Sequence, residues 1–504
     1  MKNDNTMIII GAGFAGMSAG IYARMNGFKT MIFEMHDKPG GLCTSWIRKD
    51  YTFDGCIHWL VGSSPLSAFY RYWEEVGIAR GRRFINMDEY MRFEGPDGRT
   101  VIFYTDINRL EKHLIEFSPQ DKGPVKEFIS GIKMCHPFNQ PSKRVSLVRR
   151  ILKRIYSGYS LLINAKEIQK WMKVSARDFA ERFKDPLLRE AFKEMWMPEF
   201  SIVFMFFTFS YLHNKNAGYP IGGSMPMSEA MAKRYLSLGG ELMYKKKVNE
   251  IIVDQDKATG VRLEDGTEYR STRVISAADG YSTIFRMLKG QFVNDKIREP
   301  YDKWPIFQPL IYAGIGVKRT FNNEPLSVSG FSFPLKQPVE IADSVHNRIW
   351  IHIYNHDPSL APAGKSAITV MISSRYDYWE KFASDRNEYL LKKNEISEII
   401  SDILEQRFPG IKSDIEVIDI ATPLTFERYT GNWQGSFEGW LITPENSGVI
   451  MRPMSQKLPG LKNFYMCGQW VEPGGGLPTG VISARRLIRK ICREERIRFR
   501  TNID

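Results

Sequence analysis

Apolar and polar positions near the amino terminus predict a strand, a glycine-rich turn, a helix and a second strand. The uninterrupted apolar run of residues 7–10 is typical of a buried strand, and the helix is expected to extend to about Asn26. The apolar segment 29–33 predicts the second strand, which ends at Glu34. This order of elements is that of a dinucleotide-binding unit.

The turn between the first strand and the helix has the glycine spacing of a dinucleotide-binding fingerprint. Gly11 permits the tight turn, Gly13 lets the backbone approach a pyrophosphate, and Gly16 lets the helix pack on the sheet. Free N–H groups at the helix N-terminus would face the phosphates. Glu34, 18 residues after the last glycine, can accept hydrogen bonds from ribose hydroxyls and would repel a 2′-phosphate. The whole turn consists of Gly11, Ala12, Gly13, Phe14, Ala15 and Gly16.

The chain contains only one such fingerprint, so a second nucleotide-binding domain for NAD(P)H is not expected. Electrons are therefore expected to enter or leave through a quinone, oxygen or a docked carrier, unless the reaction is redox-neutral. Two later stretches predict further strands around glycine-rich loops. In residues 219–279 a helix is followed by a β-meander, and near the carboxyl terminus a strand at 464–467 precedes a helix that starts near Pro478 or Thr479.

The most apolar stretch, residues 199–212, predicts a buried helix because it has no polar face. Two interpretations stay open for it: part of the core, or one wall of an elongated apolar substrate tunnel. Its dense apolar part, residues 200–212, is 13 residues long, well short of the roughly 20 residues of a membrane-spanning helix. No signal peptide is expected, and the chain is predicted to be soluble or peripheral.

Composition is that of an ordinary globular protein, since 43% of the 504 residues are hydrophobic and 25% are charged. This length predicts two to four domains. The five cysteines lack CxxC spacing, which disfavours a disulfide framework, a zinc ribbon and an iron–sulfur site and indicates a reducing compartment. No metal site is expected. His352 and His356 are four residues apart, but they lie in or after a strand pattern and so do not form a pair of ligands on one helix face.

The formal net charge of +13 is concentrated in residues 128–166 and 485–500. Residues 145–159 predict a helix with an apolar face opposite a basic one, which is typical of a helix on an anionic membrane surface and also of an ordinary surface helix. No nucleic-acid partner is expected, because no reading module is recognisable. The predicted location is the cytoplasm, with peripheral attachment to the inner face of the membrane as an alternative. The basic face carries Arg149, Arg150, Lys153 and Arg154.

Three blocks of the sequence resemble the flavoprotein superfamily of amine oxidases, phytoene desaturases, carotenoid isomerases and retinol saturases. They are EMHDKPGG with YTFDGCIHWL, the segment that starts at YPIGG, and LKNFYMCGQWVEPGGGLPTG. The resemblance implies FAD as the cofactor. Besides the glycine turn and Glu34, it implies cofactor contacts from Met35, Gly40, Gly41, Leu42, Val248, Ala278, Gly468, Gln469, Gly476, Thr479, Gly480 and Val481.

Three positions depart from the superfamily pattern. Leu42 stands where an arginine usually follows the paired glycines, and Cys56 stands where a glycine usually follows the Phe-Asp pair. Gln469 replaces the usual acid after the first glycine of the third block, which keeps a hydrogen bond but drops the charge. By the resemblance, the helix that follows this block points its N-terminus at the N1–O2 edge of the flavin and stabilises negative charge there.

The resemblance also implies the fold. We expect an α/β protein with a Rossmann-like FAD-binding domain of the glutathione reductase type, assembled from discontinuous segments, and an α+β substrate domain built on a mixed sheet. The expected FAD-binding domain comprises residues 1–63, 220–291 and 439–504. The expected substrate-binding domain comprises residues 64–219 and 292–438.

The function that the resemblance implies is that of a phytoene desaturase-like, FAD-dependent oxidoreductase. It would exchange a hydride between flavin N5 and a long, apolar, unsaturated substrate such as a carotenoid or retinoid. The sequence does not choose among desaturation, saturation and isomerisation. Two alternatives stay open, a flavin amine oxidase and a non-enzymatic escort of a lipid-modified partner with the same fold.

A few polar side chains complete the predicted site. His58 is the candidate catalytic residue beside the flavin, with a packed, hydrogen-bonded histidine as the alternative interpretation. Cys43 is interpreted as structural, because no second cysteine stands at the usual spacing of a redox partner. Arg428, Tyr429 and Glu438 are expected in a solvated loop, with a polar lip of the site as the alternative.

Overall fold

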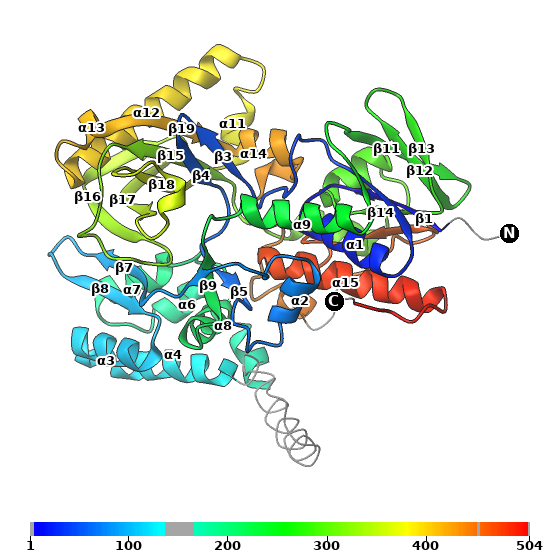
Figure 1. The fold of residues 1–504 in the computed structure, drawn as a ribbon. Helices are drawn as coiled ribbons and strands as arrows, with labels where there is room; N and C mark the ends of the chain where they lie inside the picture. Colours follow the sequence, from blue (N-terminus) through cyan, green and yellow to red (C-terminus); the bar gives the residue numbers. More distant parts are fainter. Residues whose placement is uncertain (1–4, 137–165, 451–453, 502–504) are drawn as a thin grey trace.

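The computed structural model describes residues 5–136, 166–450 and 454–501 (Figure 1). The basic helix predicted at 145–159 lies outside these residues. In the view of Figure 1, a parallel sheet with its helices lies on the right and a large mixed sheet lies on the left. The α/β fold class expected from the sequence is confirmed.

Five parallel strands form the first sheet, in the order β10–β2–β1–β14–β20. The strands predicted at 7–10 and 29–33 are confirmed, and the one predicted at 464–467 ends one residue earlier. The sheet is assembled from stretches far apart in the chain. Its strands are β1 (Thr6–Ile10), β2 (Lys29–Phe33), β10 (Glu241–Met243), β14 (Arg273–Ser276) and β20 (Phe464–Met466).

Both faces of this sheet are buried, which explains the uninterrupted apolar run of β1. Met7 and Ile9 face a core shared with three helices, whereas Ile8 and Ile10 face a core shared with an antiparallel meander. The turn between the second and third strands of that meander contains Gly266, whose φ is +84°. The helices are α1 (Phe14–Met25), α9 (Met225–Ser237) and α15 (Gly476–Glu494), and the meander strands are β11 (Val248–Asp254), β12 (Lys257–Leu263) and β13 (Glu268–Arg270).

The second large sheet has seven strands in the order β19–β15–β18–β17–β16–β7–β8. Its neighbours are antiparallel except β16 and β7, so the sheet is mixed, as expected. Helix α12 (Arg386–Arg407) covers one face with Ile396, Ile400 and Leu404. The strands are β7 (Glu89–Glu94), β8 (Thr100–Tyr104), β15 (Leu310–Val317), β16 (Phe331–Ile341), β17 (Ser344–Ile353), β18 (Ser366–Ser373) and β19 (Ile415–Ala421).

Helix α8 (Val203–His213) is the buried helix that the sequence predicts. Its Phe206 and Phe209 pack edge-on against Phe128 of α4 (Lys122–Cys135), with ring centroids 5.7 and 5.6 Å apart. Further helices are α2 (Tyr70–Glu75), α3 (Ile107–Phe117), α6 (Ala176–Ala180), α7 (Pro186–Glu194), α10 (Asp295–Lys303), α11 (Tyr376–Glu380), α13 (Ile411–Asp414) and α14 (Pro423–Thr430). The short strands are β3 (Ser45–Arg48), β4 (Tyr51–Asp54), β5 (Leu60–Val61), β6 (Phe84–Ile85) and β9 (Ala217–Pro220).

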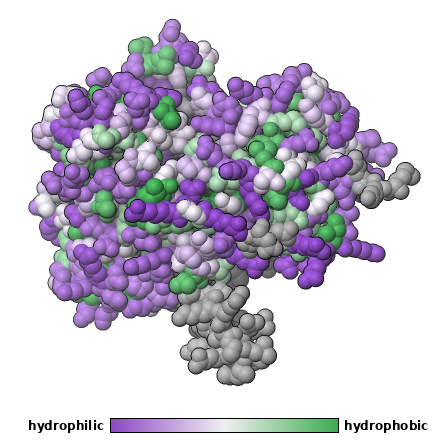
Figure 2. Space-filling model, in the orientation of Figure 1, coloured by the Kyte–Doolittle hydropathy of each residue, from purple (hydrophilic) through white to green (hydrophobic). Residues whose placement is uncertain are grey.

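The outer surface is mainly polar. Figure 2 shows one face that is mostly hydrophilic, with small apolar patches scattered over it. Among the residues that the structure describes, no helix combines the length and the apolar character needed to cross a membrane. The large apolar side chains are instead collected in the interior cores and around one cavity.

Candidate active site

A cavity of about 2170 Å³ lies at the carboxyl ends of the parallel strands and extends beneath the mixed sheet. Ordinary ligand pockets have about 300–1,000 Å³, so this cavity has room for a dinucleotide and a second ligand. Ala12, Gly16 and Val481 lie outside its wall, and His58 lies in it. The other predicted site residues in the wall are Gly11, Gly13, Phe14, Ala15, Glu34, Met35, Gly40, Gly41, Leu42, Val248, Ala278, Gly468, Gln469, Gly476, Thr479 and Gly480.

The glycine turn brings bare backbone to the cavity. A Cβ on Gly16 would lie 1.9 Å from the carbonyl oxygen of Gly11, so only glycine allows α1 to start this close to the turn. Gly13 is the N-cap of α1 and forms no side-chain capping bond, and the first helical turn holds no acid. The first N–H groups of α1 are thus left for a ligand, which is the arrangement that binds phosphate.

Glu34 holds the turn and faces the cavity. Its Oε2 accepts a hydrogen bond from the N–H of Ala12 at 2.7 Å, and its Oε1 accepts one from the N–H of His36 at 2.8 Å. Burial raises the pKa of Glu34, and these backbone hydrogen bonds act in the opposite direction. Each carboxylate oxygen keeps a second lone pair, which can accept a hydrogen bond from a hydroxyl group of a ligand.

The carboxyl-terminal glycine loop brings a second helix N-terminus to the same cavity. Helix α15 begins at Gly476, two residues before the predicted start, and Pro478 lies in its first turn. Its N-cap, Gly475, has a φ of +73° and no side-chain capping bond. A Cβ on Gly480 would lie 3.2 Å from the backbone nitrogen of Ala15, so α15 and α1 meet at their N-terminal ends. Val481 is fully buried between them and the sheet.

The far half of the cavity is aromatic. Phe204 and Phe207 of α8 line it, together with Trp196, Phe307 and Phe437. The ring of Phe200 stacks on that of Phe204 with centroids 4.3 Å apart, which fixes the orientation of the lining ring. One side of α8 therefore packs in the core while another side faces the cavity, so both sequence interpretations of this segment apply.

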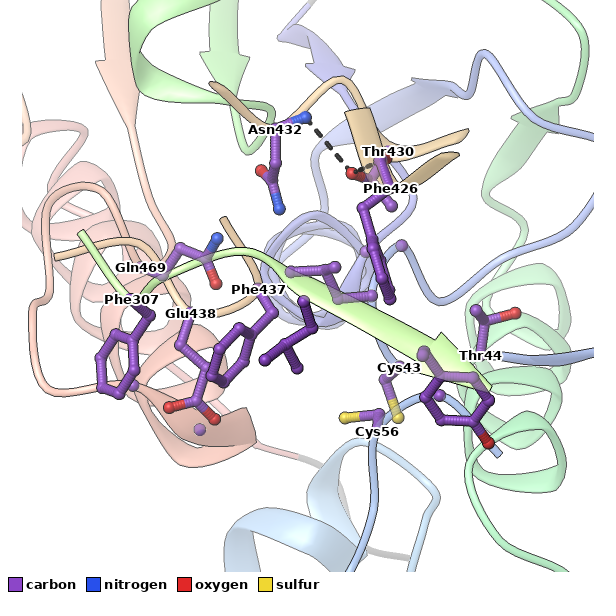
Figure 3. A pocket seen from close by; sticks show the side chains of 18 of the residues that line it. Cys43, Thr44, Cys56, Phe307, Phe426, Thr430, Asn432, Phe437, Glu438 and Gln469 are labelled. Atoms are coloured by element: carbon purple, nitrogen blue, oxygen red, sulfur yellow. Dashed lines mark hydrogen bonds between the residues drawn. The ribbon is translucent and has the colours of Figure 1, made fainter. Parts of the chain in front are cut away.

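Glu438 is the polar exception in this half. Figure 3 shows its carboxyl group beside Phe307, Phe437 and Gln469. The N–H of Gly476 donates to the carboxylate, and burial raises the pKa of Glu438 to about 7. The sequence-based expectation of a solvated loop is wrong for this residue. Arg428 and Tyr429, whose side chains are exposed, also line the cavity and form its polar lip.

His58 also lines the cavity, on the chain that follows β4. Its ring lies 5.2 Å from that of His352, and His352 in turn lies 5.6 Å from His356, measured between centroids. Burial lowers the pKa of both His58 and His356 to about 4, so these rings are neutral at pH 7. Among the described residues, no three His, Cys, Asp or Glu side chains are grouped so that they could hold a metal ion.

The premise for interpreting Cys43 as structural is that it lacks a partner cysteine, but the structure places one beside it. Cys56 donates a hydrogen bond to the Cys43 sulfur, and both residues line the cavity. The partner that the linear spacing did not reveal is supplied by the β3–β4 hairpin, which folds the two positions together.

Comparison with known proteins identifies the fold and the family. A sequence model described as flavin containing amine oxidoreductase matches residues 14–491. This chain belongs to that family. The family is one of flavin-containing enzymes, and the dinucleotide fingerprint indicates that the flavin is the dinucleotide FAD. The protein is therefore an FAD-dependent oxidoreductase.

Curated relatives in this flavin family match almost the whole chain. Prolycopene isomerase 1, chloroplastic, from an Oncidium hybrid cultivar is 24% identical over 508 residues, which cover 95% of this chain and 83% of the relative. A phytoene desaturase (neurosporene-forming) from Rhodobacter capsulatus is 25% identical over 512 residues, covering 95% and 92%. The resemblance to phytoene desaturases and carotenoid isomerases is thereby confirmed.

Solved structures show the same fold at lower identity. Cyclohexylamine oxidase from Brevibacterium oxydans superimposes with a TM-score of 0.58 at 13% identity, covering 98% of this chain and all of that one. Reduced UDP-galactopyranose mutase has a TM-score of 0.57 at 15% identity, covering 97% and 94%. At these identities the likeness establishes the fold alone.

The site fits FAD on its own geometry. Two helix N-termini, a buried carboxylate with free lone pairs and a glycine-lined passage at Gly40 and Gly41 meet in one cavity. At Gly40 the φ is +117° and a Cβ would lie 2.3 Å from the Cys43 carbonyl oxygen, so only glycine fits where the chain passes along the cavity. Residues 10–16, 34–42 and 468–480 are therefore the ones that would hold the cofactor.

Proposed function

We propose that this FAD-dependent oxidoreductase exchanges a hydride with a long, apolar, polyunsaturated substrate. The observation that carries the proposal is the aromatic half of the cavity, which continues from the glycine-lined half and contains Phe204, Phe207 and Trp196. The relatives are named as prolycopene isomerases and phytoene desaturases, which supports a polyene rather than a polar substrate. We further propose that the predicted cofactor contacts hold FAD in the glycine-lined half.

The binding energy for such a substrate comes from burial of its hydrocarbon chain. Transfer of one CH₂ group from water contributes about 0.8 kcal/mol, so a chain of many carbons needs few polar contacts. The aromatic rings of Trp196 and Phe307 offer flat surfaces on which conjugated double bonds can stack. We propose that residues 64–219 and 292–438 form the substrate domain and that the other three segments form the FAD domain.

The bound flavin supplies hydride transfer at N5. The chain must then orient the substrate, exclude water and move the proton that accompanies the hydride. We propose Glu438 for the proton step, because its carboxyl faces the cavity and its pKa of about 7 allows it both to accept and to donate near neutral pH. His58, kept neutral by burial, is proposed to orient the substrate or to assist the proton step.

The N-terminus of α15 has an electrostatic role in this proposal. Its free N–H groups carry partial positive charge and lie at the same loop as Glu438, which contacts Gly476. Negative charge that develops on a bound ring at this loop is stabilised without a lysine or arginine side chain.

The test is anaerobic mixing of the purified holoprotein with candidate substrates while the flavin absorbance is followed. Bleaching by phytoene-like polyenes, and none by primary amines, supports the proposal. Bleaching by amines alone would establish the amine oxidase alternative, and a colourless protein that takes up no FAD would establish the escort. Mass spectrometry of lipophilic molecules extracted from the purified protein then identifies the bound substrate class.

A further inference from the structure

The β3–β4 hairpin places two cysteines opposite each other at the edge of the cavity. In this antiparallel ladder Ser45 pairs with Asp54, and the N–H of Gly55 donates to the carbonyl oxygen of Thr44 at 3.0 Å. The next opposite positions outward are Cys43 and Cys56. The paired strands end at Ser45 and Asp54, and the hydrogen bond between the two cysteines keeps them in contact just beyond that end.

The Cys56 thiol donates a hydrogen bond to the Cys43 sulfur. Figure 3 shows the two cysteine side chains next to each other in the cavity wall. Two thiols in hydrogen-bond contact are the pair from which a disulfide bond can form.

The turn that carries Cys56 is fixed by a buried carboxylate. The Oδ1 atom of Asp54 accepts hydrogen bonds from the N–H groups of Cys56 and Ile57, both at 2.9 Å, and from the Ser224 hydroxyl at 2.7 Å. On the other side, the N–H of Cys43 donates to the carbonyl oxygen of Gly40 at 3.1 Å. Both cysteines are thus anchored on rigid backbone next to the glycines that would hold the flavin.

The two cysteines differ in access to the cavity. Cys43 is 1% exposed, whereas Cys56 is partly exposed and faces the cavity. The other three cysteines, Cys135, Cys467 and Cys492, are buried, and burial raises the pKa of each thiol. The pKa of Cys56 is raised as well, first by its hydrogen bond with Cys43. Mutual contact in the cavity wall, and not thiol acidity, therefore singles out Cys43 and Cys56 for redox chemistry.

We propose that Cys43 and Cys56 form a redox-active dithiol that exchanges two electrons with the bound flavin. In the oxidation step both S–H bonds break and one S–S bond forms, while two electrons and two protons pass to the oxidised flavin, which accepts both. The disulfide is reopened by an external dithiol, whose thiolate attacks the Cys56 sulfur facing the cavity and which leaves as its own disulfide. The pair gives electrons a route to the flavin that needs no NAD(P)H domain. The inference rests on the family's flavin and not on the polyene substrate.

The first test counts reducing equivalents. Air-oxidised holoprotein is titrated anaerobically with dithionite until no further dithionite is consumed, and Cys43→Ala, Cys56→Ala and the control Cys135→Ala are treated alike. The wild type and the control are expected to take up two electron pairs per flavin, and the two pair variants only one. Uptake of a single pair by the wild type would overturn the proposal.

The second test detects the bond itself and works without flavin. Apoprotein is oxidised with diamide, unfolded, alkylated and weighed by mass spectrometry, and peptide mapping locates the link. The expected result is two fewer alkyl groups than in the dithiothreitol-treated sample, with residues 43 and 56 joined. Five alkylated cysteines after oxidation would refute the pair. Neither test uses a polyene. Both results therefore stand even if the protein does not act on the proposed polyene substrate.

Discussion

Replacement of Glu438 by glutamine tests the proposed proton-transfer role in two independent ways. Burial raises the pKa of this carboxyl from 4.5 to about 7. A shift of this size corresponds to a cost of about 3 kcal/mol for keeping the ionised group in the fold. Because the folded pKa lies above the unfolded one, this cost is absent below the unfolded pKa, grows as the pH rises and is complete above about pH 7.

We therefore expect Glu438→Gln to raise the free energy of unfolding by up to about 3 kcal/mol at pH 8 and by far less at pH 5. Thermal unfolding at both pH values measures the difference. The control is Glu445→Gln, which removes an exposed carboxyl seven residues along the chain and should change stability little at either pH.

The same variant should slow reduction of the flavin by a polyene about 10²–10⁴-fold, the usual contribution of a positioned acid or base. Stopped-flow bleaching of the wild type should show an inflection near pH 7 that the variant lacks. A bleaching rate that rises through this pH indicates that the carboxylate accepts a proton, as desaturation requires. In the reverse assay, reoxidation of the reduced flavin by a polyene at a rate that falls through this pH indicates proton donation, as saturation requires. A Glu438→Gln enzyme with the wild-type rate and pH profile would refute the proton-transfer role.

Three further predictions concern the cofactor and the basic helix. Glu34→Gln should weaken FAD binding at least tenfold in a fluorescence titration. The substitution removes the charged carboxylate that accepts hydrogen bonds from the N–H groups of Ala12 and His36 and from a ribose hydroxyl. Unchanged affinity would show that Glu34 does not contact the nucleotide. Gly16→Ala should abolish FAD uptake or soluble expression, since its Cβ would meet backbone, whereas Gly123→Ala, with open space around it, should do neither. Changing the four basic residues of the predicted helix at 145–159 to Glu should release the protein from anionic vesicles in a sedimentation assay, and undiminished binding would refute the membrane interpretation.

The parts of the site that local sequence determines could be predicted from the sequence. The turn at Gly11, Gly13 and Gly16 follows from backbone sterics within six residues, and Glu34 follows from the length of one helix and one strand. The start of α15 was placed too late, because proline marks a first turn in the sequence whereas glycine disfavours a helix. In the structure α15 starts at Gly476, whose φ of +76° lies in the left-handed region that favours glycine.

The properties that depend on distant neighbours could not be predicted. Glu438 has no sequence signal for burial. Its pKa is raised because the fold buries the carboxyl in the cavity wall, and the hydrogen bond from the Gly476 N–H acts in the opposite direction. The contact between Cys43 and Cys56 depends on the register of the β3–β4 hairpin, and a shift of that register by one residue would turn one of them to the other face. Spacing along the chain carries neither piece of information.

The same hairpin explains why the two halves of the cavity belong to one site. Phe53 and Tyr51 of β4 lie over Gly314 and Gly316 of β15, where a Cβ would come within 2.5 Å of either ring. The Tyr312 hydroxyl donates to the carbonyl oxygen of Asp54 at 2.7 Å, so β15 also fixes the end of β4. A segment from the first 63 residues is in this way bound to the mixed sheet. The position of the glycine-lined half relative to the aromatic half is therefore set by direct packing of β4 on β15.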